Sequence, residues 1–227
     1  MEVQVRHNPS FAVARVVLSG GEQVKVEAGA MMAHSTGVAL DAKMEGGLLK
    51  SLKRAALGGE SLFVSSYLAP PEGGWVDVAA NLPGDVVVTE VTADVAVNVQ
   101  RGSWLCSSEG VTIDTKWGGF KNLFGGEGGF IVHASGQGQV VLSCYGALDT
   151  ITLAAGESFV LDAGHMVAYS DGIGMTMRTA TGGIAGSVKS AEGLVFEFTG
   201  PGWVMTQSRN PRGLLDWLTA NLPGQRA

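Results

Sequence analysis

The chain has 227 residues, 45% of them hydrophobic, so it can bury a sizeable core without disulfides or metals. Fifteen lysines and arginines against 21 aspartates and glutamates give a formal charge of -6, which argues against a phosphate-binding surface covering the whole protein. Residues 1–6 show no basic stretch leading into an apolar run, and no apolar segment reaches the roughly 18 residues of a membrane span. We therefore expect a cytoplasmic protein.

Charged residues make up only 16% of the chain, while glycine, at 34 residues, is well above its usual share. A surface this poor in charge predicts burial between subunits, so we expect a homo-oligomer, with a trimer favoured. The two cysteines, Cys106 and Cys144, lie in apolar surroundings and are too few for a disulfide scaffold. We expect both to be buried thiols.

The first predicted strand follows a Gly-Glu pair, alternates, and ends at Gly29, seven residues after Glu22. The same pattern recurs from Glu157 to Gly164, and a related strand ends at Gly102. Residues 86–99 also alternate with period two and are rich in β-branched side chains. These segments predict short strands punctuated by glycine turns.

A Gly-Xaa-Val step begins a strand at Gly74, Gly138 and Gly202, separated by 64 residues each time. Equal spacing indicates an internal repeat of about 64 residues, and we expect these glycines at equivalent sites. The predicted fold class is all-β, with β-sandwich units in a pseudo-threefold repeat. The units are 1–83, 84–146 and 147–209, followed by a C-terminal helix and tail, 210–227.

Two segments predict helices. Residues 47–58 place three leucines on one side and three basic residues on another, as in a short basic amphipathic helix. Near the C-terminus, Asn210 can cap a helix that has Pro211 at its first position. The following leucines and Trp217 form an apolar stripe that needs a covering surface.

Several motifs together resemble the bacterial branch of the family named for altered-inheritance-of-mitochondria protein twenty-four. They are the segment 47–63, Gly129-Phe130 with Gly136-Gln-Gly138, and 192–202 with its Phe-Thr-Gly-Pro-Gly ending. The resemblance covers nearly the whole chain. It implies a β-sandwich fold like that of the tryptophan-binding RNA attenuation protein, with internal duplication and a ring-like oligomer, but it implies no activity.

We find no catalytic constellation, cofactor motif or metal-ligand spacing in the sequence. The four histidines, at positions 7, 34, 133 and 165, lack close ligand spacing, and neither cysteine has a neighbouring histidine as base. Three recurring glutamates, Glu60, Glu127 and Glu192, could gather as paired carboxylates, although hydrogen bonding to backbone turns is favoured. The glycine clusters lack the residues that complete a phosphate-binding loop.

Each unit carries an apolar, lysine-bearing excursion at the corresponding place: residues 48–57, 120–124 and 184–189. The partner-binding residues predicted there are Lys50, Lys53, Arg54, Phe120 and Phe124. We expect a non-enzymatic scaffold or binding protein whose excursions meet a membrane surface or a protein partner. Filling a subunit interface is the equally weighted alternative for these residues.

A second hypothesis is a small-ligand or RNA binder of the attenuation-protein type, although nucleic acid is the less favoured partner. Tryptophans could stack on bases in such a binder, but strand tryptophans more often belong to the core. The candidates are Trp75, Trp104, Trp117 and Trp203.

Overall fold

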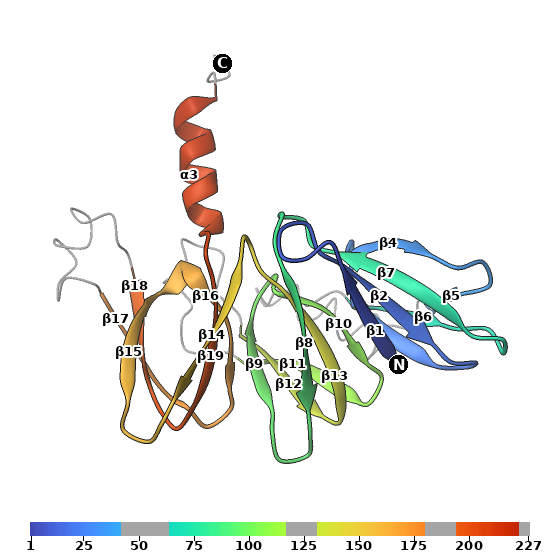
Figure 1. Cartoon of the computed structure of the whole chain (residues 1–227), viewed down its shortest axis with the longest axis horizontal. Coiled ribbons are helices and arrows are strands. Elements are labelled where there is room, and N and C mark those ends of the chain that lie inside the picture. Colours follow the sequence, from blue (N-terminus) through green and yellow to red (C-terminus); the bar gives the residue numbers. More distant parts are fainter. Residues whose placement is uncertain (42–63, 117–130, 180–193, 223–227) are drawn as a thin grey trace, which may run out of the picture.

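The structure, a computed structural model, describes residues 1–41, 64–116, 131–179 and 194–222. Its strands form four antiparallel sheets that follow one another along the molecule (Figure 1). Sheet 1 has the order β1 (Glu2–Arg6), β2 (Val13–Leu18), β7 (Gly74–Ala79), β4 (Met31–His34). Sheet 2 has the order β5 (Ala39–Asp41), β6 (Val64–Leu68), β3 (Gln23–Glu27), β10 (Trp104–Ser108), β13 (Gly138–Ser143), β8 (Val86–Val91).

Sheets 3 and 4 complete the body. Sheet 3 has the order β11 (Val111–Lys116), β12 (Ile131–Gly136), β9 (Val97–Gln100), β16 (Met166–Ser170), β19 (Gly202–Gln207), β14 (Leu148–Leu153). Sheet 4 has the order β15 (Ser158–Asp162), β18 (Leu194–Thr199), β17 (Gly174–Thr179). The prediction of an all-β sandwich fold is confirmed.

One arrangement of six strands occurs three times. The strand order β2-β7-β4 returns as β8-β13-β10 and as β14-β19-β16, and β3-β6-β5 returns as β9-β12-β11 and β15-β18-β17. The pairing of β4 with β7, β10 with β13 and β16 with β19 shifts register at Met32, Leu105 and Val167 respectively. A bulge at the same place in each copy indicates that the backbone geometry repeats as well as the order. The unit boundaries expected after residues 83, 146 and 209 fall in connections between elements.

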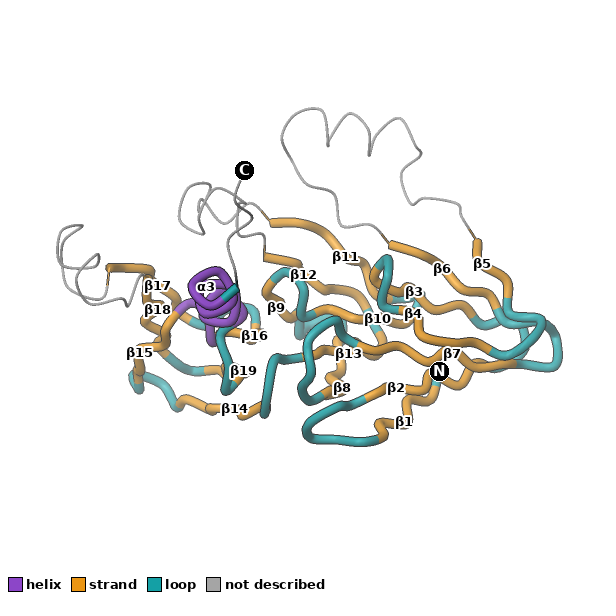
Figure 2. The backbone as a smooth tube through the Cα atoms, turned by 90° about the horizontal axis from the view of Figure 1, so that it is seen from above, coloured by secondary structure: helices purple, strands orange, loops and turns teal. Residues whose placement is uncertain are grey.

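The units are joined by continuous sheets. Sheet 2 pairs β3 of the first unit with β10 of the second, and sheet 3 pairs β9 of the second with β16 of the third. Each of these two junctions is three residue pairs long, and Cys106 opposite Val26 matches Ala168 opposite Val99. Figure 2 shows the three units arranged in one row.

The repeated glycines have a steric cause. Gly74, Gly138 and Gly202 begin the equivalent strands β7, β13 and β19, as expected for equivalent sites. In each unit a serine hydroxyl accepts a hydrogen bond at 3.0 Å from the backbone N–H of the residue after the glycine. The serine and donor pairs are Ser35 with Trp75, Ser108 with Gln139, and Ser170 with Trp203. A Cβ added at the glycines would lie 2.7, 2.7 and 2.5 Å from these serine side chains, so only glycine admits the contact.

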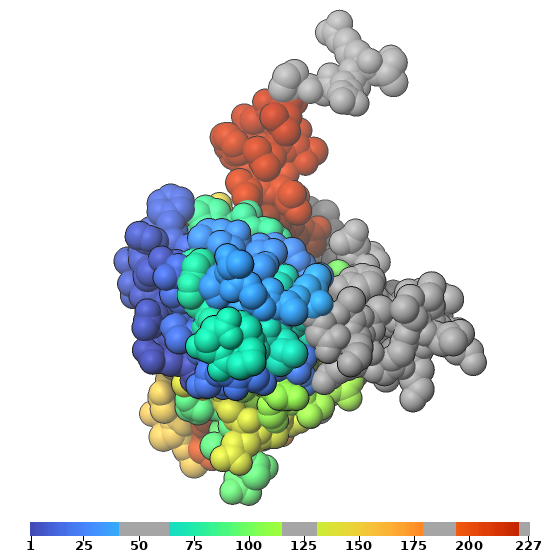
Figure 3. All heavy atoms as spheres, turned by 90° about the vertical axis from the view of Figure 1, so that its right-hand side faces the viewer, coloured from blue at the N-terminus to red at the C-terminus, as the bar shows by residue number. Residues whose placement is uncertain are grey.

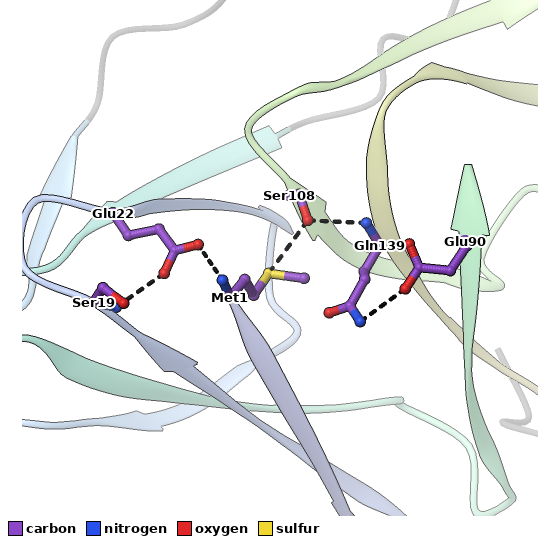
Figure 4. Close-up of polar contacts among 6 residues, drawn as sticks. All are labelled: Met1, Ser19, Glu22, Glu90, Ser108 and Gln139. Atoms are coloured by element: carbon purple, nitrogen blue, oxygen red, sulfur yellow. Dashed lines mark hydrogen bonds and ion pairs between the residues drawn. The ribbon is translucent and has the colours of Figure 1, made fainter. Parts of the chain in front are cut away.

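Figure 4 shows the hydrogen bond to the serine in the second unit, where Gln139 donates through its backbone N–H to Ser108 and through its side chain to Glu90.

The Gly-Glu motif also has a structural role. The carboxylate of Glu22 accepts from the backbone of Ser19, and that of Glu157 accepts equivalently from Ala154. Glu22 additionally pairs with the Met1 ammonium. Both glutamates therefore fix a turn, which explains their recurrence.

Three apolar cores lie between successive sheets, and the next unit helps to complete each of the first two. The first core includes Leu105 and Cys106 of the second unit, and the second core includes the equivalent Val167 and Ala168 of the third. The third core, around Phe196 and Phe198, takes its described residues from the second and third units alone. Removing large areas of apolar surface from water is the main source of stability in such cores.

One buried ion-pair cluster lies on the outer face of sheet 1. Asp77 is 2% exposed and accepts a bidentate pair of hydrogen bonds from Arg15, at 2.8 and 2.9 Å, and a third from Arg6 at 2.8 Å. The Arg15 guanidinium also stacks 3.9 Å from the centre of the Trp75 ring. The hydrogen bond from Arg15, together with the one from Arg6, lowers the pKa of Asp77 despite its burial.

The C-terminal helix α3 (Pro211–Asn221) begins as predicted, with the Asn210 side chain accepting from the backbone of Arg212 at 2.9 Å. It projects from the body, and none of its residues is buried (Figures 1 and 3). The short 3-10 helix η1 (Ala163–His165) is the other described helix. No helix among the described residues has the length and apolar character needed to cross a membrane. The basic helix predicted at 47–58 lies outside the described residues.

Replacing Gly138 with alanine should destabilise the protein strongly, because Gly138 has φ +142° and a new Cβ would meet Ser108 at 2.7 Å. We expect a loss of roughly 3 kcal/mol in the free energy of unfolding, measured by denaturant titration. Gly172→Ala is the matched control, since Gly172 has φ +85° but open space around it. It should cost about 1 kcal/mol from backbone strain alone. Equal losses would contradict the steric explanation.

Asp77→Asn should lower stability by roughly 2 kcal/mol at neutral pH by leaving two arginines without their carboxylate. Because the pKa of Asp77 is lower in the folded protein, its contribution is complete above the unfolded value of about 4 and is lost as pH falls through the folded value. The gap between wild type and variant should therefore close under acid, as followed by thermal unfolding against pH. Asp149→Asn, at an exposed site, should show no such gap.

Candidate functional site

The predicted partner-binding residues Lys50, Lys53, Arg54, Phe120 and Phe124 all lie outside the described residues, as do the three recurring glutamates. The structure does describe the strands that flank these excursions. Segment 42–63 joins β5 to β6, segment 117–130 joins β11 to β12, and segment 180–193 joins β17 to β18. These strand pairs are equivalent in the repeat, so the three segments leave the body at equivalent places.

A groove with a cavity volume of about 270 Å³ lies where the three units meet near the base of α3. Its walls come from the end of β3, the connection after β7, the turn between β9 and β10, and the end of β13. Gln207 of the third unit and Pro211 at the start of α3 complete it. The groove is therefore lined by residues from all three units.

The groove holds one carboxylate with a shifted pKa. Burial raises the pKa of Glu27, and the positive charge of Arg101 opposes the rise. The side-chain amide of Gln207 bridges the rim, accepting from the backbone of Tyr145 at 2.8 Å and donating to Gly164 at 2.9 Å. These groups can bind polar atoms, but no nucleophile with an adjacent base lies among them.

Cys144 also lines the groove, where its surroundings disfavour the reactive thiolate form. Burial raises the pKa of its thiol, and the Sγ–H donates to the Gly146 carbonyl at 3.2 Å. Cys106 is fully buried, and the pKa of its thiol is raised by the same cause. Both cysteines are free, so the prediction of two buried thiols is confirmed.

The histidines are dispersed over the units. His133 contacts the Asn98 amide oxygen at 3.1 Å, His165 contacts the Gln207 carbonyl at 2.7 Å, and His34 lies at the surface. Across the four described ranges, no three His, Cys, Asp or Glu side chains converge as a metal site would require.

The strand tryptophans are not arranged as a stacking platform. Trp104 is 1% exposed, Trp75 is covered by Arg15, and Trp203 is half-buried. Trp117 lies outside the described residues. Among the described tryptophans the exposed one is Trp217 of α3, at 62%; Leu215 of the same helix is also 62% exposed, and Leu222 at its C-cap is 61% exposed. The sequence predicted the apolar stripe of α3 and also predicted that another surface would bury it. In the described part of the chain no such surface buries a residue of α3.

The groove itself was missed at the sequence level. The available signal was the repeated strand ending in glycine, because Glu27 and Arg101 precede Gly29 and Gly102 in two copies of that motif. This signal could indicate a groove only if the equivalent turns of neighbouring units were known to lie side by side.

Comparisons with known proteins agree with this architecture. Residues 3–209 match the family described as Mitochondrial biogenesis AIM24. An uncharacterised protein of Streptococcus pyogenes serotype M6 is 26% identical over 231 aligned residues, covering 98% of this chain and 92% of that protein. A crystal structure of a Streptococcus pyogenes protein superposes with a TM-score of 0.82 at 25% identity, covering 97% of this chain and 99% of that one.

Proposed function

This chain belongs to the family described as Mitochondrial biogenesis AIM24, and we propose that it is a non-enzymatic oligomeric scaffold that contacts a membrane surface or a protein partner. The observation that carries the proposal is the exposed apolar stripe on α3. Leu215 and Trp217 of α3 and Leu222 at its C-cap are more than half exposed, and the helix stands away from the body. Leu214 and Leu218, which are partly exposed, lie between Leu215 and Trp217 around the helix and connect them into one broad apolar face. Exposed apolar groups of this kind mark interaction sites.

The repeated architecture supports the same proposal. Three sequence excursions connect equivalent strand pairs, so one chain carries three related candidate contact segments. The first excursion contains Lys50, Lys53 and Arg54 beside leucines, which is the composition that an anionic membrane surface attracts. Among the two partner classes, this composition favours the membrane surface.

Vesicle flotation tests the proposal directly. The purified protein should float with vesicles rich in phosphatidylserine and should not float with neutral vesicles. The triple variant Lys50→Gln, Lys53→Gln, Arg54→Gln should bind the anionic vesicles at least ten-fold more weakly, because each basic residue contributes about 1 kcal/mol near such a surface. The double variant Leu215→Ser, Trp217→Ser should also bind more weakly through loss of apolar contact.

The matched control removes three positive charges elsewhere. Arg101→Gln, Arg178→Gln, Arg209→Gln changes the net charge equally and should leave vesicle binding within about two-fold of wild type, since these residues lie outside both the basic excursion and α3. No affinity of the wild type for anionic vesicles would exclude the membrane partner. Equal losses of vesicle binding in both triple variants would show that binding depends on net charge and not on the basic excursion.

A further inference from the structure

One side-chain position recurs in all three units, two residues before the glycine that follows β3, β9 and β15. Glu27 occupies it in the first unit, Gln100 in the second and Asp162 in the third. All three side chains end in oxygens that accept hydrogen bonds. Glu27 and Gln100 line the groove, whereas Asp162 contacts the N-cap residue of α3. The same kind of acceptor therefore meets different surroundings in the three units.

In the third unit the chain itself satisfies this acceptor with nitrogen donors. One carboxylate oxygen of Asp162 accepts a hydrogen bond from the backbone N–H of Gly164 at 2.8 Å. The same oxygen accepts a second, longer bond at 3.4 Å from the side-chain amide of Asn210, which caps α3. The position is therefore closed by the turn and by the start of the helix.

The equivalent acceptors of the first two units lack such donors. The side-chain amide oxygen of Gln100 is buried and has no hydrogen-bond partner among the described residues. Burial raises the pKa of Glu27, and the positive charge of Arg101 opposes the rise, but no described group donates a hydrogen bond to the carboxylate. Buried polar groups are nearly always paired, so two unpaired acceptors in one groove point to a donor from outside the chain.

Two buried serine hydroxyls extend the same lining. Ser103 and Ser143 are 7% and 2% exposed, and both line the groove. The Ser103 N–H donates to the Gln100 carbonyl at 3.1 Å, and the Ser143 N–H donates to the Ser103 carbonyl at 2.7 Å, so backbone bonds hold the three residues together. Neither hydroxyl is hydrogen-bonded to another described residue. Because a hydroxyl can accept as well as donate, they add acceptors beside Gln100.

The charges of the lining select the kind of donor. Among the described lining residues, Glu27 is half-buried and Arg101 is exposed, so water screens the positive charge more than the negative one. A carboxylate ligand would be repelled by Glu27, and a neutral polyol would leave its charge uncompensated. A primary ammonium brings one positive charge and three N–H donors, which match a carboxylate, an amide oxygen and a hydroxyl.

We propose that the groove binds a small molecule through a primary ammonium group, held by the Glu27 carboxylate, the Gln100 amide oxygen and one of the two serine hydroxyls. The ammonium takes the place that the chain's own N–H groups take at Asp162. The terminal torsion of a glutamine is broad, so the Gln100 amide can turn its oxygen toward the ligand. The cavity volume of about 270 Å³ suits a ligand of only a few carbon atoms, whose far end meets Arg101 at the rim.

Ligand-observed NMR titration tests the chemistry of the ligand with butylammonium as the probe. Wild type should bind it with a Kd of about 1 mM or tighter, as a ligand this small allows. Butanol lacks the charge, and butyltrimethylammonium keeps the charge but has no N–H donor; each should bind at least about ten-fold more weakly. Butyltrimethylammonium binding as tightly as butylammonium would overturn the proposal, as would no binding of butylammonium up to roughly 20 mM.

Variants test the location. Glu27→Gln should weaken butylammonium binding about ten-fold, and Gln100→Met, which keeps the side-chain length, about five-fold. Glu72→Gln removes the same charge at an exposed site and should leave binding within about two-fold of wild type. Because burial disfavours the charged form of Glu27, Glu27→Gln should not lower the thermal midpoint, so weaker binding cannot reflect unfolding. Equal losses in Glu27→Gln and Glu72→Gln would contradict the assigned site.

A second pair of probes separates a simple amine from an amino acid. Tighter binding of 4-aminobutanoate than of butylammonium, with the advantage lost in Arg101→Gln, assigns an amino acid whose anion faces the rim. Equal binding of the two probes assigns a simple amine. Butanoate that binds as tightly as 4-aminobutanoate would place the anion in the site and overturn the proposal. None of the ligand-holding residues belongs to α3 or to the excursions, so vesicle binding and ligand binding can each fail while the other holds.

Discussion

The structure depends on one interaction: the backbone pairing of a strand from one unit with a strand from the next. Through it, sheets 2 and 3 become continuous over two units each, and a core that begins in one unit is completed by side chains of its neighbour. Only three residue pairs form each junction, but they hold Leu105 and Val167 over the first two cores. The units are therefore interdependent parts of one body.

Much of this organisation could be predicted from the sequence because its causes are local. The 64-residue spacing of Gly74, Gly138 and Gly202 arises from a serine that approaches each strand start too closely for a Cβ. The Gly-Glu motif recurs because a carboxylate fixes the same turn in two units. The α3 start was predictable from Asn210 and Pro211, whose capping chemistry involves only neighbouring residues.

What the sequence could not indicate are the contacts between units. No local pattern distinguishes Met32, which is exposed, from Leu105, which is buried, because the difference lies in whether another unit precedes them. The groove near Glu27 and Arg101 was missed for the same reason, since its walls come from three units. The expected cover for the α3 stripe was also an assumption about packing over a distance, and in the described body Trp217 and Leu215 remain exposed.

The proposed scaffold role relies on surfaces that the described body leaves exposed. Helix α3 projects from the body, and its exposed apolar side chains suit a partner surface. The groove contributes polar groups but no nucleophile with an adjacent base, consistent with a binding role. In the proposed function, repetition would multiply weak contacts, because related segments connect equivalent strand pairs in all three units.

Hydrogen exchange followed by mass spectrometry tests the central role of the junction most directly. Amides of β3, β9, β10 and β16 should be protected, because the junctions are built into the chain and bury these strands inside continuous sheets. Amides of β5 and β17, which are edge strands of sheets 2 and 4, should exchange faster. Junction amides that exchange as fast as those of β5 and β17 would contradict the account.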